Sequence, residues 1–266
     1  MKIKESKCEY EIDLPRCGAD AHFQIYDKKQ KKKVRADWLD KTGLPTTHFT
    51  GLFFAPCGSG KSSLVCSLLT SMKPKSRAYC GCYDKIYFCC PITSLRSMKD
   101  DPYESIPDNQ IYEEFDDRFM SDMNEITLEN SEAGLDSCII IDDACNKLKR
   151  YENALANLIL THRHRKTTIF VLCQDVCQCP LSIRSNATCC WFFAQSNQKR
   201  MELLRTEFMS FMTLDEYKQF YNWCFKKKGD NLFIKFSLPY TYYKNFKKIE
   251  FEGLENSVTP EREECA

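Results

Sequence analysis

Residues 55–63, with the sequence APCGSGKSS, have the side-chain types and spacing of a phosphate-binding loop. Gly58 and Gly60 permit a tight turn whose backbone N–H groups can point at a phosphate. The ammonium of Lys61 can reach the β- and γ-phosphate oxygens, and the Ser62 hydroxyl can bind Mg²⁺. We therefore expect the loop to bind ATP with Mg²⁺ through a set of six consecutive residues: Gly58, Ser59, Gly60, Lys61, Ser62 and Ser63.

The residues on either side of this loop predict the strand and the helix that it needs. The apolar run before the loop contains Phe49, Leu52, Phe53 and Phe54, and the helical pattern after it contains Leu64, Val65, Leu68 and Leu69. The amino end of that helix favours an anion. Ala55 stands where the motif has its first glycine, which makes the match less specific. The competing interpretation is a chance Gly-Ser-Gly-Lys turn between a strand and a helix.

A pair of acids follows a second apolar run, in the segment CIIIDDA at 138–144. Two adjacent like charges at the end of a buried strand repel each other and need a reason to be there. Neighbouring side chains of a strand point in opposite directions, but at its carboxyl end both can approach a metal–phosphate centre. We expect Asp142 to hold Mg²⁺, largely through water, and Asp143 to orient or deprotonate the attacking water. The alternative is an acidic turn after a strand.

Gln174 ends a third apolar run, TTIFVLCQ at 167–174. An amide beside the loop strand can hydrogen-bond the attacking water or the γ-phosphate, so we expect Gln174 to act as a sensor. The alternative is that Gln174 simply caps the end of its strand.

The basic segment THRHRK at 161–166 lies just before this run. Guanidinium groups suit the spread negative charge of a phosphoryl group in transfer, and in oligomeric NTPases such an arginine often reaches the neighbouring subunit's site. Arg163 and Arg165 are candidates, and Arg184 is a weaker third. The alternative for Arg163 or Arg165 is a basic residue that complements a helix carboxyl end.

The order of the apolar runs predicts the fold class. Runs rich in β-branched and aromatic residues recur from 48 to 194, separated by longer amphipathic or mixed segments: HFTGLFFA, DKIYFCCPI, DSCIIIDDA, TTIFVLCQ and ATCCWFFA. This alternation predicts an α/β fold with a mostly parallel central sheet flanked by helices. Helical spacing over 197–225 and a late strand at 231–238 complete the pattern.

The domain boundaries follow from the same pattern. We expect an ATPase domain over 48–246, preceded by a partly basic extension at 1–47 with a lysine-rich run at 28–33. That run is interpreted as a solvated face or linker rather than a phosphate-contacting patch. The Glu-rich, apolar-poor segment 247–266 is expected to be a disordered tail.

Composition limits the partners and the compartment. The net charge is only +1, so any nucleic-acid site must be a local patch. No apolar run approaches the ~18 residues of a membrane helix, and no secretory signal is visible, which predicts an intracellular protein. The 17 cysteines are therefore expected to be mostly buried free thiols. A zinc site is disfavoured because no usual ligand spacing fits the one cluster of candidates: His162, His164, Cys173, Cys177 and Cys179.

The ordered set APCGSGKSS, IIIDDA, THRHR, FVLCQD and PLSIRSNA resembles a specific family. It is similar to the genome-packaging ATPases of nucleocytoplasmic large DNA viruses, virophages and polinton-like elements, a branch of the FtsK–HerA superfamily. The segments WFFAQSNQKRMELL and YKNF share the likeness, which covers residues 48–246. The specific feature is the basic segment before a strand that ends in glutamine, because the loop and the acid pair are common to many NTPases.

This resemblance implies a RecA-like P-loop fold of the ASCE type, a homo-oligomeric ring, and ATP-driven translocation of double-stranded DNA into a viral capsid. It implies capsid or portal-vertex proteins as partners, and the host-cell cytoplasm at the assembly site, or the virion, as the location. By motif, Lys61 and Ser62 become nucleotide ligands, Asp142 the Mg²⁺ ligand and Asp143 the base. Gln174 becomes the sensor and Arg163 the arginine that acts in trans.

Other interpretations stay open at this point. The chain can be a helicase or another nucleic-acid-remodelling ATPase, or a P-loop kinase or nucleotide switch without a nucleic-acid partner. For a motor, the phosphate backbone of DNA supplies a grip that is independent of base sequence. Lys147, Lys149 and Arg150 are candidates for its basic lining. The segment Lys226–Lys228 is a further candidate, although solvated surface is favoured for it.

Overall fold

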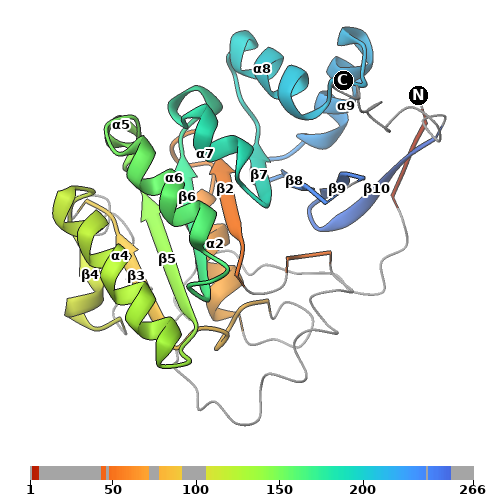
Figure 1. The fold of residues 1–266 in the computed structure, drawn as a ribbon. Helices are drawn as coiled ribbons and strands as arrows, with labels where there is room; N and C mark the ends of the chain where they lie inside the picture. Colours follow the sequence, from red (N-terminus) through yellow and green to blue (C-terminus); the bar gives the residue numbers. More distant parts are fainter. Residues whose placement is uncertain are drawn as a thin grey trace, which may run out of the picture.

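The structure, a computed structural model, describes residues 2–5, 43–45, 48–71, 78–91, 106–237 and 239–252. Its strands form one sheet of ten strands in the order β1-β10-β9-β8-β7-β2-β6-β5-β3-β4 (Figure 1). The strands from β7 to β4 in this order are parallel, and β8, β9, β10 and β1 add an antiparallel wing. The predicted α/β class with a mostly parallel sheet is confirmed.

The strand bounds place each predicted apolar run in the sheet. The parallel part consists of β2 (Thr50–Phe54), β3 (Lys85–Cys89), β4 (Ile111–Tyr112), β5 (Ser137–Asp142), β6 (Thr167–Cys173) and β7 (Cys189–Phe193). The antiparallel part consists of β1 (Lys2–Glu5), β8 (Asn231–Lys235), β9 (Thr241–Lys244) and β10 (Lys247–Glu252).

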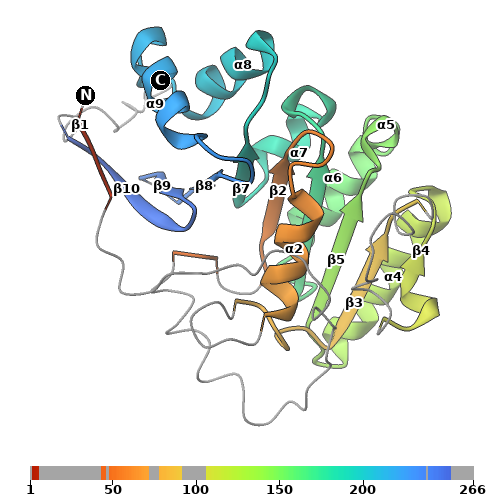
Figure 2. The same cartoon turned by 180° about the vertical axis from the view of Figure 1, so that it is seen from behind.

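The longer helices lie between these strands in the chain. They are α2 (Lys61–Thr70), α4 (Asp117–Glu132), α6 (Glu152–Thr161), α8 (Gln198–Phe208) and α9 (Leu214–Cys224). The shorter helical segments are η1 (Asp108–Gln110), α5 (Cys145–Leu148), η2 (Val176–Gln178) and α7 (Leu181–Ser185). Helices α4 and α6 cover one face of the sheet, and Figure 2 shows α2 on the opposite face.

Apolar side chains of the central strands pack on both faces of the sheet, which explains their nearly continuous apolar character. In β2, Leu52 and Phe54 pack in one core cluster together with Leu155 of α6. Phe53, which points the other way, packs in a second cluster with Leu68 of α2. Because α2 begins directly after the loop, this second cluster anchors the helix whose amino end faces the site.

The antiparallel wing corrects the predicted end of the domain. Strand β10 begins at Lys247 and pairs with both β9 and β1. Residues 247–252, which the sequence placed in a disordered tail, therefore belong to the sheet, as do residues 2–5 of the predicted extension. The alternation of Ile249 and Phe251 with charged residues is a strand signal, but the Glu-rich composition of the following residues obscured it. The lysine-rich run at 28–33 lies outside the described residues.

Most of the described cysteines are buried, and Cys57 and Cys177 are the exposed ones. Burial raises the pKa of the Cys138 and Cys189 thiols well above the ordinary value. Those two thiols thus stay protonated and pack as small apolar groups. In the described ranges, no three metal-ligating side chains gather into a metal site. No helix in those ranges combines the length and the apolar character that crossing a membrane requires.

Candidate nucleotide-binding site

The loop between β2 and α2 leaves the amino end of α2 open to an anion. Gly58 and Gly60 have φ angles of 72° and 101°, in the left-handed region that favours glycine. A Cβ built on either glycine meets no atom within 4 Å, so the space beside the turn is open. Gly60 caps α2 without a side-chain hydrogen bond, and the first helical turn carries no acid. The amide groups of that turn are therefore not capped by a side chain, which leaves the positive end of the helix for a phosphate.

Three side chains from β2–α2 and β5 meet beside this loop. The Ser62 hydroxyl donates a hydrogen bond of 2.5 Å to Asp142 Oδ2. Lys61 Nζ lies 3.7 Å from Asp142 Oδ1, and both side chains are largely buried. Strands β2, β6 and β5 end level with each other, because Phe54 pairs with Cys173 and Asp142 with Leu172. The parallel sheet therefore brings together residues that are eighty positions apart in the sequence.

The environment of Asp142 makes its ionised form costly in the protein without ligand. Burial raises the pKa of Asp142 above its ordinary value, while the Lys61 ammonium and the Ser62 hydroxyl lower it by less. Asp142 Oδ1 is buried and has no hydrogen-bond partner within the part of the chain that the structure describes. A buried carboxylate oxygen without a hydrogen bond, next to a serine hydroxyl, fits Mg²⁺, which prefers oxygen ligands. The residues present thus fit the expected metal.

We expect Asp142→Asn to raise the melting temperature of the ligand-free protein at neutral pH. A group whose pKa is raised by folding contributes stability below its unfolded pKa, and that contribution is lost as the pH rises through the folded pKa. The asparagine amide does not ionise, so the variant avoids this loss of stability at neutral pH. In acid, where Asp142 is protonated, the variant should have no higher melting temperature than wild type. Melting curves with and without Mg-ATP provide the measurement, and the variant should also lose the stabilisation by Mg-ATP. A lower melting temperature at neutral pH with full stabilisation by Mg-ATP would contradict this account.

The second acid of the pair contacts the predicted sensor. Asp143 has a φ of 56°, which ends the alternation of the strand immediately after Asp142. Aspartate is one of the few residues besides glycine that adopts this region readily. Gln174 Nε2 donates a hydrogen bond of 3.2 Å to Asp143 Oδ1. The left-handed residue thus lets the neighbouring acids serve different partners, Asp142 the Lys61 and Ser62 side chains and Asp143 the Gln174 amide.

The predicted arginines lie away from this cluster. Arg163 is exposed in the turn before β6, at the end of the strand opposite Gln174. The seven residues of β6 separate the two ends by about 20 Å. Arg165 donates to Thr161 Oγ1 at 2.9 Å and to the Asn124 carbonyl, so it fastens the turn to α4. Of the two, Arg163 has the exposed side chain, and its position at the far end of β6 keeps it away from the nucleotide site of this chain.

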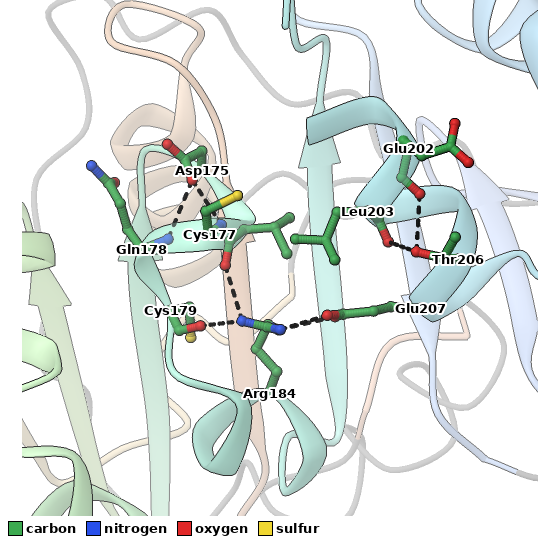
Figure 3. Close-up of polar contacts among 10 residues, drawn as sticks. Asp175, Cys177, Gln178, Cys179, Arg184, Glu202, Leu203, Thr206 and Glu207 are labelled. Atoms are coloured by element: carbon green, nitrogen blue, oxygen red, sulfur yellow. Dashed lines mark hydrogen bonds and ion pairs between the residues drawn. The ribbon is translucent and has the colours of Figure 1, made fainter. Parts of the chain in front are cut away.

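Arg184, the third candidate, has a structural partner. Its Nε donates to Glu207 Oε2 at 2.9 Å, and its Nη1 donates to the carbonyls of Val176 and Cys179 (Figure 3). This arrangement ties α7 to η2 and α8. A guanidinium with these partners acts as an anchor between elements, and reaching a neighbouring subunit would require breaking the ion pair with Glu207.

Asp175 and its partner Arg200 lie beside the predicted sensor, and the sequence did not single them out. Asp175, which directly follows Gln174, is buried and forms an ion pair of 2.8 Å with Arg200 of α8. Its Oδ1 accepts hydrogen bonds from the amides of Cys177 and Gln178, visible in Figure 3. The peptide that follows the sensor is thereby fixed to α8. A polar pair Gln-Asp after an apolar run was the available signal, but its partner lies 25 residues downstream, where the sequence gives no indication of contact.

Gln195, two residues after the end of β7, is a further polar residue at this edge of the sheet. The side chain is buried, and Nε2 lies 3.5 Å from the carbonyl oxygen of Phe54, the last residue of β2. The Tyr221 hydroxyl of α9 bonds both the amide and the carbonyl of Gln195. The root of the phosphate loop is therefore braced from β7 as well as from β6, where the Ala55 amide donates to Cys173.

The strand–loop–helix with Lys61 and Ser62, the acid pair at the carboxyl end of β5, and the strand β6 between β2 and β5 define the P-loop NTPase fold of the ASCE type. The RecA-like expectation from the sequence is confirmed at the level of the fold. No protein-family model and no curated protein matches the sequence.

Solved structures of similar fold include the genome-packaging NTPase B204 from Sulfolobus turreted icosahedral virus 2. Its sulfate complex is 13% identical, with 75% of this chain and 96% of that chain covered and a TM-score of 0.55. Its complex with ATP-gammaS is 12% identical, with 74% and 95% covered and a TM-score of 0.50. The DNA-packaging ATPase B204 from Sulfolobus turreted icosahedral virus is 12% identical, with 75% and 98% covered and a TM-score of 0.52. The expected likeness to viral packaging ATPases is therefore found in the fold.

Proposed function

We propose that the chain is an Mg²⁺-dependent ATPase that translocates double-stranded DNA into a viral capsid. The single observation that carries the enzymatic part is the convergence of Lys61, Ser62 and Asp142, with the Asp143–Gln174 pair beside them. Two described neighbours support the motor part, since they are a genome-packaging NTPase and a DNA-packaging ATPase.

The proposed mechanism assigns one task to each side chain. Amide groups of the loop and the Lys61 ammonium bind the phosphate chain, while Ser62 and Asp142 hold the metal. Bound Mg²⁺ supplies positive charge against the phosphate oxygens. Asp143 accepts the proton of the water that attacks the γ-phosphorus, as the bond to the ADP oxygen breaks. Gln174 orients the Asp143 carboxylate through its hydrogen bond and senses the γ-phosphate.

We propose a homo-oligomeric ring, which the place of Arg163 supports. Arg163 lies at the opposite edge of the sheet from the nucleotide site of its own chain, so it could stabilise a transferring phosphoryl only at the site of a neighbour. We propose Arg163 for this role. The proposed partners are duplex DNA, capsid or portal-vertex proteins and further copies of the chain, at a viral assembly site in the host cytoplasm.

ATP turnover with and without duplex DNA tests the proposal. We expect basal turnover that requires Mg²⁺ and rises several-fold with duplex DNA of any base sequence. Turnover indifferent to DNA would retain the nucleotide site and overturn the motor, and a small-molecule phosphoryl acceptor would then be sought. Strand separation by the purified protein would favour a helicase instead. Arg163→Ala mixed with an Asp143→Asn subunit should recover part of the activity if the arginine acts in trans.

A further inference from the structure

A short basic turn connects α9 to β8 at the edge of the sheet that carries the phosphate loop. We call residues 226–230, with the sequence KKKGD, the lysine turn. Strand β8 runs antiparallel to β7, and Asn231 at its start pairs with Phe193 at the end of β7. Strand β7 runs parallel to β2, with Phe192 beside Phe54. The lysine turn therefore lies at the nucleotide edge, two strand positions or roughly 10 Å from β2.

Hydrogen bonds hold the lysine turn in one shape. Asp230 Oδ2 accepts the Lys227 amide at 2.8 Å, and Asp230 Oδ1 accepts Asn245 Nδ2 at 2.9 Å. The Asn231 amide donates to Asn245 Oδ1 at 2.9 Å, and the Asn245 amide donates to the Asn231 carbonyl at 3.0 Å. Both carboxylate oxygens of Asp230, the single acid of the turn, thus accept hydrogen bonds from neutral N–H groups. Its contacts fix the backbone and link the turn to the one between β9 and β10.

The three lysine side chains of this turn outnumber its single acid and give it a net positive charge. Lys226, Lys227 and Lys228 are exposed, and their ammonium groups form no ion pair with a carboxylate in the described ranges. Close by, Lys244 Nζ lies 4.2 Å from the centre of the Trp223 ring and donates to the Trp223 carbonyl at 2.9 Å. That fourth charge is also held by groups that do not neutralise it.

Two of the three residues of the other predicted basic lining are paired with acids, and Lys149 is exposed. Lys147 pairs with Glu114 at 3.0 Å, and Arg150 pairs with Asp117 at 3.5 Å. Exposed pairs of this kind contribute little to stability, but they cancel much of the local field that attracts a polyanion. We therefore favour the lysine turn over this lining, although the sequence favoured solvated surface for the turn.

We propose that the lysine turn, together with Lys244, contacts the phosphate backbone of duplex DNA, an inference that rests on the proposed function. Lysines act as point charges on phosphates and carry no base preference, as a motor that moves along any sequence requires. The chain as a whole is close to neutral, so the grip has to come from a local patch. The rigid turn holds that patch at the edge where ATP is bound and hydrolysed.

The test compares two variants with the same number of removed charges. One is Lys226→Gln/Lys227→Gln/Lys228→Gln, and the matched control is Lys147→Gln/Lys149→Gln/Arg150→Gln. Binding of a short fluorescent duplex to the full chain is measured over a range of salt concentrations. Melting temperature and the shift caused by Mg-ATP verify that both variants fold and bind nucleotide.

We expect the lysine-turn variant to lose about tenfold or more in duplex affinity at low salt. Each lost phosphate contact lowers the slope of log K against log salt by about 0.9, so three contacts lower it by up to about 2.7. The triple lysine-to-arginine variant should keep the slope, and the control should stay near wild type. Equal losses in both glutamine variants, or a loss confined to the control, would overturn the inference.

The wild-type chain separates this inference from the proposed function. If wild-type protein binds duplex DNA and the lysine-turn variant binds it equally well, the contact lies elsewhere while the motor stands. If wild-type protein shows neither duplex binding nor stimulation of turnover by DNA, the motor itself fails, and the DNA contact fails with it.

Discussion

Asp143→Asn should leave ATP binding intact and reduce turnover by roughly 10²–10⁴-fold, the usual contribution of a general base. The substitution keeps the shape of the side chain and removes its ability to take a proton. Asparagine adopts the left-handed region at least as readily as aspartate, so the φ of 56° at this position stays unstrained. The amide can still accept the hydrogen bond from Gln174. Turnover by a phosphate-release assay and affinity for a fluorescent ATP analogue provide the two measurements.

Gln174→Ala is the matched control for this result. It removes the group that orients the carboxylate but leaves the base, so the reduction in turnover should be smaller than for Asp143→Asn. The double variant should lose less than the product of the two single losses, because the two residues share one contact. If Asp143→Asn turns over at the wild-type rate, or if it loses nucleotide binding as well, Asp143 is not the base.

The sequence predicted the parts of the site that depend on neighbouring residues. The glycine loop, the apolar run before the acid pair and the apolar run before Gln174 each show where a strand ends and which polar group follows it. Parallel strands place such ends at one edge, so their convergence was expected. The position of β6 beside β2 was expected from the family resemblance, but no local pattern gives strand order, because it depends on long-range packing. That order is what joins Gln174 to Asp143.

The arginines show where residue type alone is insufficient. Arg163, Arg165 and Arg184 were all candidates for the same role, but the second bonds Thr161 and the third pairs with Glu207. Their partners come from elements that are distant in the chain or, for Thr161, from the end of the preceding helix. The basic residues considered for DNA contact show the same limit. Lys147 and Arg150 pair with Glu114 and Asp117, which lie more than thirty residues earlier in the chain. The net charge of a surface patch can be judged only when the ion pairs of its residues are known.

Lys61→Ala should abolish turnover and weaken ATP binding by about 10-fold to 150-fold, the equivalent of a charged hydrogen bond of 1.5–3 kcal/mol. The ammonium is the cation that reaches the phosphate chain from the start of α2, and alanine leaves no charge in its place. Lys61→Arg is the matched control because it keeps the charge. It should retain more binding than Lys61→Ala, although its planar group fits the site of a lysine poorly. Nucleotide affinity and turnover are measured as for Asp143→Asn.

The same substitution should change stability in a pH-dependent way, which a pure loss of substrate contact would not do. Lys61 Nζ lies 3.7 Å from Asp142 Oδ1 and lowers a pKa that burial raises, so its removal raises the pKa of Asp142 further. In acid, Asp142 is protonated in both proteins, and their melting temperatures should agree. As the pH rises through the folded pKa, the variant should lose stability relative to wild type. Adding Asp142→Asn should remove this difference. A deficit that is constant from acid to neutral pH would show that the Lys61–Asp142 contact has no electrostatic part in the fold.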